Sequence, residues 1–227
     1  MKNKYLSVAA LALSTFLFVG CDDEDIKDFF PKPSDGDSKN WDIINFEMYK
    51  TGFLTEVKSS NGTGPIMVNA MRRQSNGTYA NGNHAMIFNT HTPTGDDTDL
   101  FTGIHHPQGY DLSKVLIINQ DMNSTPNDNQ YGGTMTLDFS SMGTVTLHEL
   151  TALDIDKYEN MSYVRLYGAN NRMLLEKKLM NMGNNSVQVV DLGNTSGVMR
   201  LEVTLDGTNN GMPAGSGAID NIKFMKD

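Results

Sequence analysis

Carboxylate and amide side chains gather in two short stretches of this 227-residue chain. Asp96, Asp97 and Asp99 lie within the stretch 94–100, and Asp128 stands between two asparagines. Oxygen donors of these types are the ligands that Ca²⁺ prefers in proteins. Neither stretch has the full spacing of an EF-hand loop. Three carboxylates in four positions repel each other, so a rigid loop needs a cation, whereas a mobile, solvated loop does not. We predict Asp97, Asp99 and Asp128 as calcium ligands, with a solvated loop as the alternative.

A third acidic stretch is the sequence DIDKYE at residues 154–159. It resembles the Glu-x-Asp-x-x-Glu strand motif of laminarinase-like β-sandwich glycosidases, which implies two carboxyl groups about 5–5.5 Å apart for retaining hydrolysis. The sequence has Asp154 where that family has glutamate, and Trp41 is its only tryptophan, whereas such clefts usually contain several. No catalytic residue is therefore assigned. A glycosidase that uses Asp154, Asp156 and Glu159 is an alternative function.

Short runs of alternating apolar residues must position these side chains. From residue 41 onward the runs recur every 10 to 20 residues, between stretches of Gly, Asn, Asp and Pro, and their period is typical of half-buried strands. The predicted strands are 41–49, 66–71, 84–89, 115–119, 134–139, 145–154, 163–167, 186–191, 198–205 and 218–224. Residues 172–180 fit either a helix or a strand in a hairpin. Ten strands without helical crossovers predict an all-β fold, an antiparallel β-sandwich (jelly roll), over residues 41–227.

The two ends of the predicted domain carry a further pair of acids. The first strand contains INFE at residues 44–47, and the last contains AIDNI at residues 218–222. These strands resemble the terminal strands of carbohydrate-binding-module-like jelly rolls, in which two such acids and backbone carbonyls hold a structural calcium. The resemblance implies Glu47 and Asp220 as calcium ligands. The alternative is that Asp220 shapes a turn and Glu47 is solvated.

Several further stretches along the chain together match the sequence pattern of one domain. They include AMIFNT at 85–90, PTGDD at 93–97, LDID at 153–156 and GSGAID at 215–220. Together they resemble a domain of unassigned function in secreted and surface proteins of bacteria and algae, and the match extends over about residues 66 to 224. The sequence departs from it at Asn89, where that domain usually has aspartate. The resemblance implies an extracellular β domain and names no reaction.

The first twenty residues contain two lysines, no acid and the apolar run 8–19. Twelve residues are too few to span a hydrocarbon core of about 30 Å as a helix, so the run predicts a signal peptide at residues 1–20. The small residue before Cys21 resembles a bacterial lipobox, which implies cleavage there and a diacylglycerol on the Cys21 thiol.

An acidic run at residues 22–25 follows the predicted lipidation site. It resembles the surface-export signal of lipoproteins in the Bacteroidetes group. The rest of the segment 21–40 contains prolines and charges and is predicted to be a tether. We therefore expect a lipid-anchored protein of the outer membrane whose domain faces outward.

The charge balance limits the kinds of partner, and the cysteine count limits the covalent cross-links. The chain has a net charge of −9, and loss of residues 1–20 leaves 16 basic against 27 acidic residues, a net charge of −11. This balance argues against binding nucleic acid or anionic lipid headgroups, since both need basic patches. Cys21 is the only cysteine, so the mature chain has no internal disulfide.

These features together predict a cell-surface lipoprotein, held in the membrane through Cys21, that acts as a non-enzymatic binding or adhesion module. We expect calcium as a structural cofactor and a glycan or another surface protein as partner. Besides the glycosidase, the alternative is a structural or assembly subunit of an outer-membrane or fimbrial complex.

Overall fold

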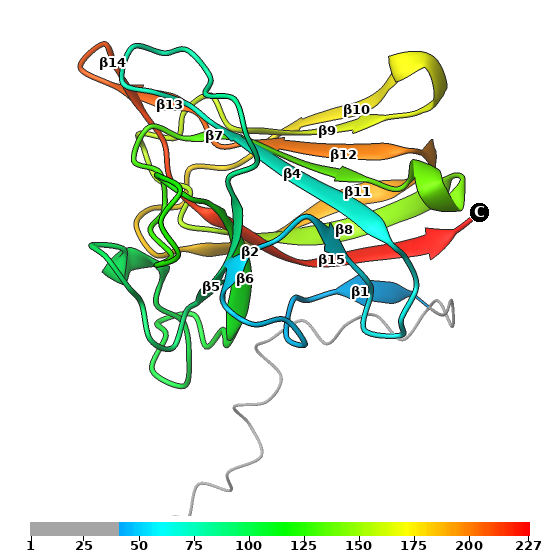
Figure 1. Cartoon of the computed structure of the whole chain (residues 1–227), viewed down its shortest axis with the longest axis horizontal. Coiled ribbons are helices and arrows are strands. Elements are labelled where there is room, and N and C mark those ends of the chain that lie inside the picture. Colours follow the sequence, from blue (N-terminus) through cyan, green and yellow to red (C-terminus); the bar gives the residue numbers. More distant parts are fainter. Residues whose placement is uncertain (1–40) are drawn as a thin grey trace, which may run out of the picture. The chain divides into compact units, whose positions relative to one another are not determined.

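The computed structural model describes residues 41–227 (Figure 1). The predicted signal peptide at residues 1–20, the lipidation site Cys21 and the tether at 21–40 lie outside the described residues. Within the part that is described, no helix has both the length and the apolar character needed to cross a membrane.

The described residues form short strands joined by turns and by three short 3₁₀ helices. The strands are β1 (Asp42–Ile44), β2 (Gly52–Phe53), β3 (Glu56–Val57), β4 (Ile66–Arg72), β5 (Ala85–Asn89), β6 (Lys114–Ile118), β7 (Gly133–Asp138), β8 (Val145–Leu153), β9 (Tyr163–Tyr167), β10 (Met173–Lys178), β11 (Val187–Val198), β12 (Arg200–Thr204), β13 (Gly207–Asn209), β14 (Met212–Ala214) and β15 (Ala218–Lys226). The 3₁₀ helices are η2 (Thr98–Leu100), η3 (Ser140–Met142) and η4 (Ala169–Asn171).

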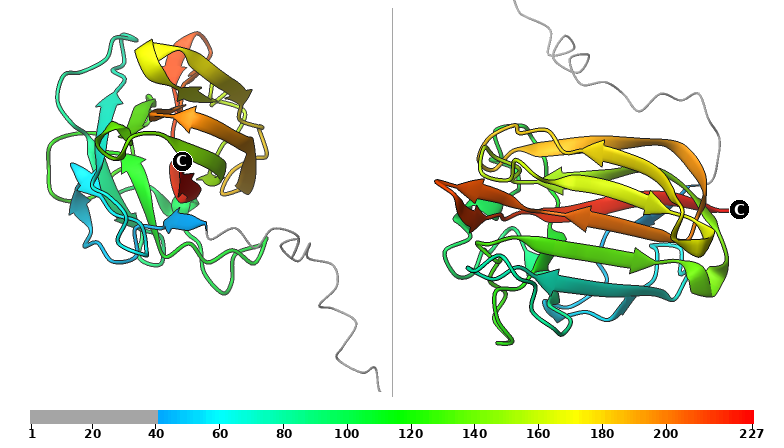
Figure 2. Two further views of the ribbon diagram at one scale, coloured as in Figure 1. Left: turned by 90° about the vertical axis from the view of Figure 1, so that its right-hand side faces the viewer. Right: turned by 90° about the horizontal axis from the view of Figure 1, so that it is seen from above.

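Two antiparallel sheets pack face to face, as Figure 2 shows. One sheet has the order β11-β8-β15-β6-β5-β2, with β1 paired to β15, and the other has the order β10-β9-β12-β7-β4-β3. The chain crosses repeatedly between the sheets, for example from β4 to β5 and from β6 to β7. This arrangement confirms the predicted all-β antiparallel sandwich.

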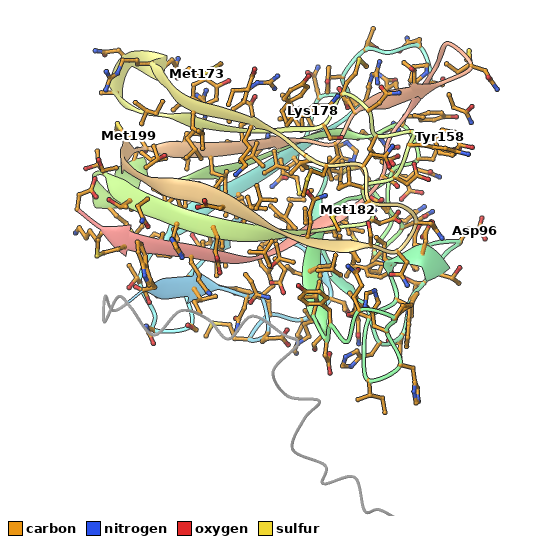
Figure 3. The ribbon with its side chains drawn as sticks, turned by 180° about the vertical axis from the view of Figure 1, so that it is seen from behind. Asp96, Tyr158, Met173, Lys178, Met182 and Met199 are labelled. Atoms are coloured by element: carbon orange, nitrogen blue, oxygen red, sulfur yellow. The ribbon has the colours of Figure 1, made fainter. Side chains whose placement is uncertain are left out.

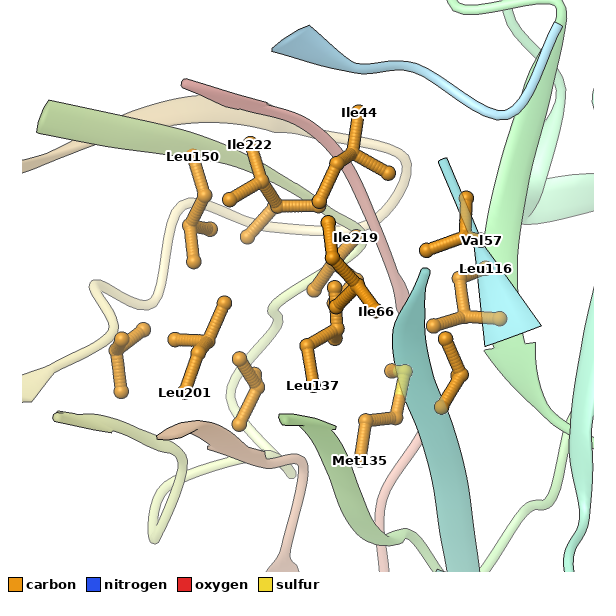
Figure 4. Packing of buried hydrophobic residues seen from close by; sticks show 14 of the residues in the cluster. Ile44, Val57, Ile66, Leu116, Met135, Leu137, Leu150, Leu201, Ile219 and Ile222 are labelled. Carbon is orange, nitrogen blue, oxygen red and sulfur yellow. The ribbon is translucent and has the colours of Figure 1, made fainter. Parts of the chain in front are cut away.

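The main core lies between the sheets and follows the period of two residues. In β4, Ile66 and Val68 point inward and are buried, whereas Met67 is exposed. Figure 4 shows Leu137 near Ile66 and Leu201 farther along the same sheet, with Ile44, Ile219 and Ile222 of the other sheet above them. Burying one such aliphatic side chain fully stabilises the folded state by roughly 1.5–3 kcal/mol, relative to leaving it exposed.

Strands β5 and β6 are buried on both faces. Ile87 and Leu116 point into the main core, whereas Phe88 and Ile117 point to the outer face of their sheet. There they form a second cluster with residues of the segment 90–113, which folds over that face. This packing fixes the loop that carries Asp96, Asp97 and Asp99.

The structure differs from the predicted strands in several places, two of which concern segments named above. Residues 172–180 contain strand β10, which pairs with β9, so the hairpin alternative is correct and the helix is not. The first predicted strand, 41–49, ends at Ile44 because Phe46 adopts a left-handed conformation (φ 56°) and closes a turn with Tyr49.

Candidate functional site

A cavity of about 320 Å³ with several acidic residues in its lining lies at one end of the sandwich. Four loop segments line it, and its acidic residues are Asp96, Asp97, Asp99, Asp128 and Glu159. Figure 3 shows Asp96 and Tyr158, both of which line the cavity, at this end of the molecule. We call this cavity the acidic pocket.

The two loops predicted to bind calcium contact each other here. Asp97 Oδ2 accepts a hydrogen bond from the backbone amide of Asp128 (2.7 Å). The Asp128 carboxylate is buried and accepts amide hydrogen bonds from Asn129 (2.9 Å) and Gly217 (2.7 Å). Contacts between the loops before and after β6 therefore bring Asp97, Asp99 and Asp128 to the lining of one pocket.

The segment 154–159 forms the adjacent wall of the acidic pocket. Glu159 Oε2 accepts a hydrogen bond from the backbone amide of Asp156 (2.9 Å), and Asp156 Oδ1 accepts one from the amide of Tyr158 (2.6 Å). The loop packs directly on Gly207, where a Cβ atom would lie 1.6 Å from the Tyr158 carbonyl oxygen. A side chain at that position would displace the loop.

Residues 154–159 do not form the strand that the glycosidase motif requires. Strand β8 ends at Leu153, and Asp154 follows it with a left-handed backbone (φ 62°), so residues 154–159 form a loop. Asp154 is buried, and its two carboxylate oxygens accept hydrogen bonds from the Asn185 amide (2.6 Å) and the Ser216 hydroxyl (3.1 Å). The three carboxyls of the motif therefore do not line one face of a strand.

Burial and mutual repulsion raise the pKa values of these acids. Burial, followed by the charges of Asp99 and Asp96, raises the pKa of Asp97 to about 6. Burial raises the pKa of Asp154 to about 7, and burial with a hydrogen bond shared with Asp156 raises the pKa of Glu159 to about 8. Burial also raises the pKa of Asp128 well above its usual value. A cation among these groups would therefore be stabilising at neutral pH.

The acidic pocket has no ready-made shell of side chains for a metal ion. Among the described residues, no three His, Cys, Asp or Glu side chains are arranged so that they could hold one. The Asp128 carboxylate is already engaged by two backbone amides. Calcium ligation by Asp97, Asp99 and Asp128 would require a change in these side chains, and it stays a prediction.

The second predicted calcium pair lies where β1 and β15 meet. These strands pair antiparallel, with Ile44 opposite Ile222. Asp220 is 1% exposed, and its Oδ1 has no hydrogen-bond partner, while Oδ2 accepts from the Asn221 side chain (3.0 Å). Burial raises the pKa of Asp220 well above its usual value, and the negative charge of Glu47 adds to this effect. Glu47 lies in the turn after β1 and is exposed, and its Oε1 accepts a hydrogen bond from the Lys114 amide (3.2 Å). The buried Asp220 oxygen without a partner suits a cation. Calcium ligation by Glu47 and Asp220 stays a prediction.

Sequence reasoning missed several groups that line the acidic pocket. Gln130, Tyr158 and Ser216 were not assigned to any site, and Glu159 was named only within the 154–159 motif. Gln130 lies two residues after Asp128, so adjacency along the chain could have suggested it. Tyr158 and Ser216 reach the pocket only through the fold.

The fold and these two sites define an antiparallel β-sandwich domain with an acidic pocket built from loops at one end. No family model and no curated protein sequence matches the chain. Among solved structures, a fucose-binding module of Streptococcus pneumoniae is 12% identical, with a TM-score of 0.30, over 43% of this chain and 66% of the module. The chain thus spans less than two thirds of the length of that module.

Two other solved structures cover more of the chain. The lectin-binding domain of lectinolysin, in complex with Lewis b, is 10% identical with a TM-score of 0.33, over 63% of this chain and 93% of that domain. The K2 cleaved adhesin domain of Lys-gingipain is 13% identical with a TM-score of 0.34, over 82% of this chain and 97% of that domain. Similarities this low carry no argument about ligand or activity.

Proposed function

We propose that this chain is a surface lipoprotein, anchored through Cys21 in the outer membrane, whose β-sandwich is a non-enzymatic binding module for glycans, stabilised by calcium. The acidic pocket carries this proposal. It is a concave site of about 320 Å³, within the usual range of about 300–1,000 Å³ for small-molecule sites. It presents carboxylate and amide groups that hydrogen-bond sugar hydroxyls.

Calcium has two proposed places. Glu47 and Asp220 would hold a structural ion at the junction of β1 and β15, because the buried Asp220 Oδ1 has no other partner. Asp97, Asp99 and Asp128 would hold a second ion in the acidic pocket, where a cation offsets the mutual repulsion of the acids. An ion in the pocket would also offer free coordination positions to ligand hydroxyls.

A glycan array tests the glycan part of the proposal. The full-length protein is applied in calcium and in EDTA, together with Asp99→Asn. We expect binding to at least one glycan in calcium, and a loss of about tenfold or more in EDTA and in Asp99→Asn. Glu56→Gln, an exposed acid on β3 away from the pocket, is the matched control and should bind like the wild type.

Other outcomes would point to a different function. An array that stays silent for every glycan in calcium would contradict the proposal. Turnover of a β-glucan panel that disappears in Asp156→Asn would favour a hydrolase. A stable partner that co-purifies from solubilised membranes would favour an assembly subunit.

A further inference from the structure

A second polar cavity, of about 240 Å³, lies at the opposite end of the β9/β12 sheet. Asp138, Ser140, Tyr167, Asn170, Asn171 and Arg200 line it, together with Met199 and Gly168. Strand β9 starts after Tyr158 and Glu159 of the acidic pocket and ends at Tyr167, so the two cavities are separated by the length of this sheet. Figure 3 shows Met199 and Tyr158 at opposite ends of the molecule. We call the second cavity the turn-end pocket.

Strand register places a cation at the centre of the turn-end pocket. Arg200 on β12 lies opposite Asp138 on β7 and opposite Tyr167 on β9. Its guanidinium lies over the Tyr167 ring, 4.2 Å from the centroid, and Nη1 donates to Asn171 Oδ1 (2.8 Å). Arg200 Nε is buried without a hydrogen-bond partner. The guanidinium is therefore fixed in position, while most of its five N–H donors are unused by described residues.

A carboxylate with unused hydrogen-bond capacity lines the same cavity. Asp138 Oδ1 accepts a hydrogen bond from the Ser140 amide (2.8 Å), and no ion pair joins the Asp138 carboxylate to another described residue. Asp138 and Arg200 are directly opposite each other on neighbouring strands, so both side chains lie on one face of the sheet. A donor and an acceptor therefore line one small cavity.

A neighbouring arginine on the same sheet face shows the ordinary arrangement. Arg165 lies over the Tyr163 ring, 4.9 Å from the centroid. Its Nε donates to Glu176 (2.8 Å) and its Nη1 donates to the Thr204 hydroxyl (3.2 Å). Arg165 is paired within the protein, whereas Arg200 has the same aromatic support and no carboxylate partner.

The turn after β9 adds amide side chains to the pocket. Asn170 and Asn171 both have left-handed backbones (φ 56° and 55°), and both residues line the pocket. Gly168 lies at the start of the turn, where a Cβ atom would come within 2.9 Å of the Gly197 carbonyl oxygen. The rim therefore adds amide donors and acceptors to the arginine and the aspartate.

We propose that the turn-end pocket binds one neutral sugar residue through a vicinal diol, with one hydroxyl donating to Asp138 and the next accepting from Arg200. A carboxylate, sulfate or phosphate would be repelled by Asp138, and a cation would be repelled by Arg200. A polyol satisfies both because each hydroxyl can donate and accept. A cavity of about 240 Å³ lies just below the range of drug-sized sites, so it suits a single ring. The inference extends the glycan-binding function proposed above, but it requires neither calcium nor the acidic pocket.

Ligand-observed NMR titration in EDTA tests the site. The full-length protein, in a detergent without a sugar headgroup, is titrated with methyl glycosides of glucose, galactose, mannose and fucose. We expect at least one glycoside to bind at millimolar concentrations, and its affinity to fall about tenfold in Arg200→Lys and in Asp138→Asn. Arg165→Lys is the matched control and should bind like the wild type. Replacing EDTA with calcium should leave this affinity unchanged.

Several results would contradict sugar binding at the turn-end pocket. If no glycoside binds in EDTA, or if folded Arg200→Lys and Asp138→Asn both bind like the wild type, the turn-end pocket is not a sugar site. Tighter binding of methyl glucuronide than of the neutral glycosides would overturn the selection against anions. If Arg200→Lys fails to fold, Asn171→Ala removes the rim contact and should weaken binding in its place. Failure of the acidic-pocket proposal appears separately, as an array on which no glycan signal falls in EDTA or in Asp99→Asn.

Discussion

Glu159 is a buried acid whose neighbours favour its protonated form. Its Oε2 accepts the Asp156 amide hydrogen bond, and its carboxyl group shares a hydrogen bond with the Asp156 carboxylate. A glutamine can make both contacts, because its oxygen accepts and its amide nitrogen donates. Glu159→Gln should therefore mimic the protonated residue at every pH.

We predict that Glu159→Gln stabilises the protein at pH 8 in EDTA by about 1–3 kcal/mol, since it removes a buried charge, and that the gain disappears at pH 5. Denaturant unfolding at both pH values measures the difference. Glu56→Gln, at an exposed position, is the control and should change stability at neither pH. A destabilised Glu159→Gln at pH 8 would show that the ionised form is favoured.

The acids of the pocket were partly predictable from the sequence. Asp97, Asp99 and Asp128 were recognisable because dense carboxylates and amides in Gly- and Asn-rich stretches resemble cation loops. That Glu159 lines the same pocket was not predictable, since this depends on where the loop after β8 folds. The resemblance of the terminal strands suggested that Asp220 and Glu47 lie near each other, and the Glu47 charge does act on Asp220. The unpartnered oxygen of Asp220 depends on the packing around it and was not predictable.

Strands β5 and β6 show what an unbroken apolar run means at the scale of an element. The sequences AMIF and VLII were predicted as strands, but the period of two residues is absent because both faces are buried. A sequence shows that such a run is buried, but not which segment covers its second face. The cover, residues 90–113, has few regular elements of its own.

We predict that Phe88→Ala costs about 3–5 kcal/mol of folding stability, because it opens a cavity under the segment 90–113. Hydrogen exchange should also show faster exchange in that segment, while β4 remains protected. Val189→Ala, at a half-exposed strand position, is the control and should cost less than about 1 kcal/mol. Unchanged exchange in 90–113 would mean that Phe88 does not hold it.

The strands that the sequence did not predict are short or only half-buried. Strand β10 was ambiguous because Leu174 and Leu175 are only partly buried beside charged residues. Strands β2, β3, β13 and β14 have two or three residues each, which is too short for a periodic signal.

The acid cluster gives the whole molecule a characteristic response to pH. The pKa values of Asp97, Asp154 and Glu159 are raised to about 6, 7 and 8. Between about pH 4 and pH 8 the folded protein therefore holds protons that the unfolded chain has released. The stability that these protonated acids contribute is complete below about pH 4. It falls as the pH rises from about 4 to about 8, and it changes little above that.

We predict that in EDTA the melting temperature falls between pH 5 and pH 8, with a loss of stability on the order of 2–4 kcal/mol. Saturating calcium at pH 8 should raise it again by about 5 °C or more, since a ligand at a hundred times its dissociation constant adds about 2.7 kcal/mol. Thermal unfolding with calcium, and with magnesium as the control ion, measures this. The absence of any calcium shift would mean that neither proposed site binds the ion.

The pairing of β1 with β15 has a mechanical consequence. β1 has only three residues, and it is the first described strand, so a pull on the chain from its N-terminal side loads this pair before any other. Under the proposed anchoring through Cys21, the drag of a bound ligand would reach the membrane through these few hydrogen bonds. Calcium between Glu47 and Asp220 would fasten the chain directly behind β1, so the ion would set the force at which the domain begins to unravel.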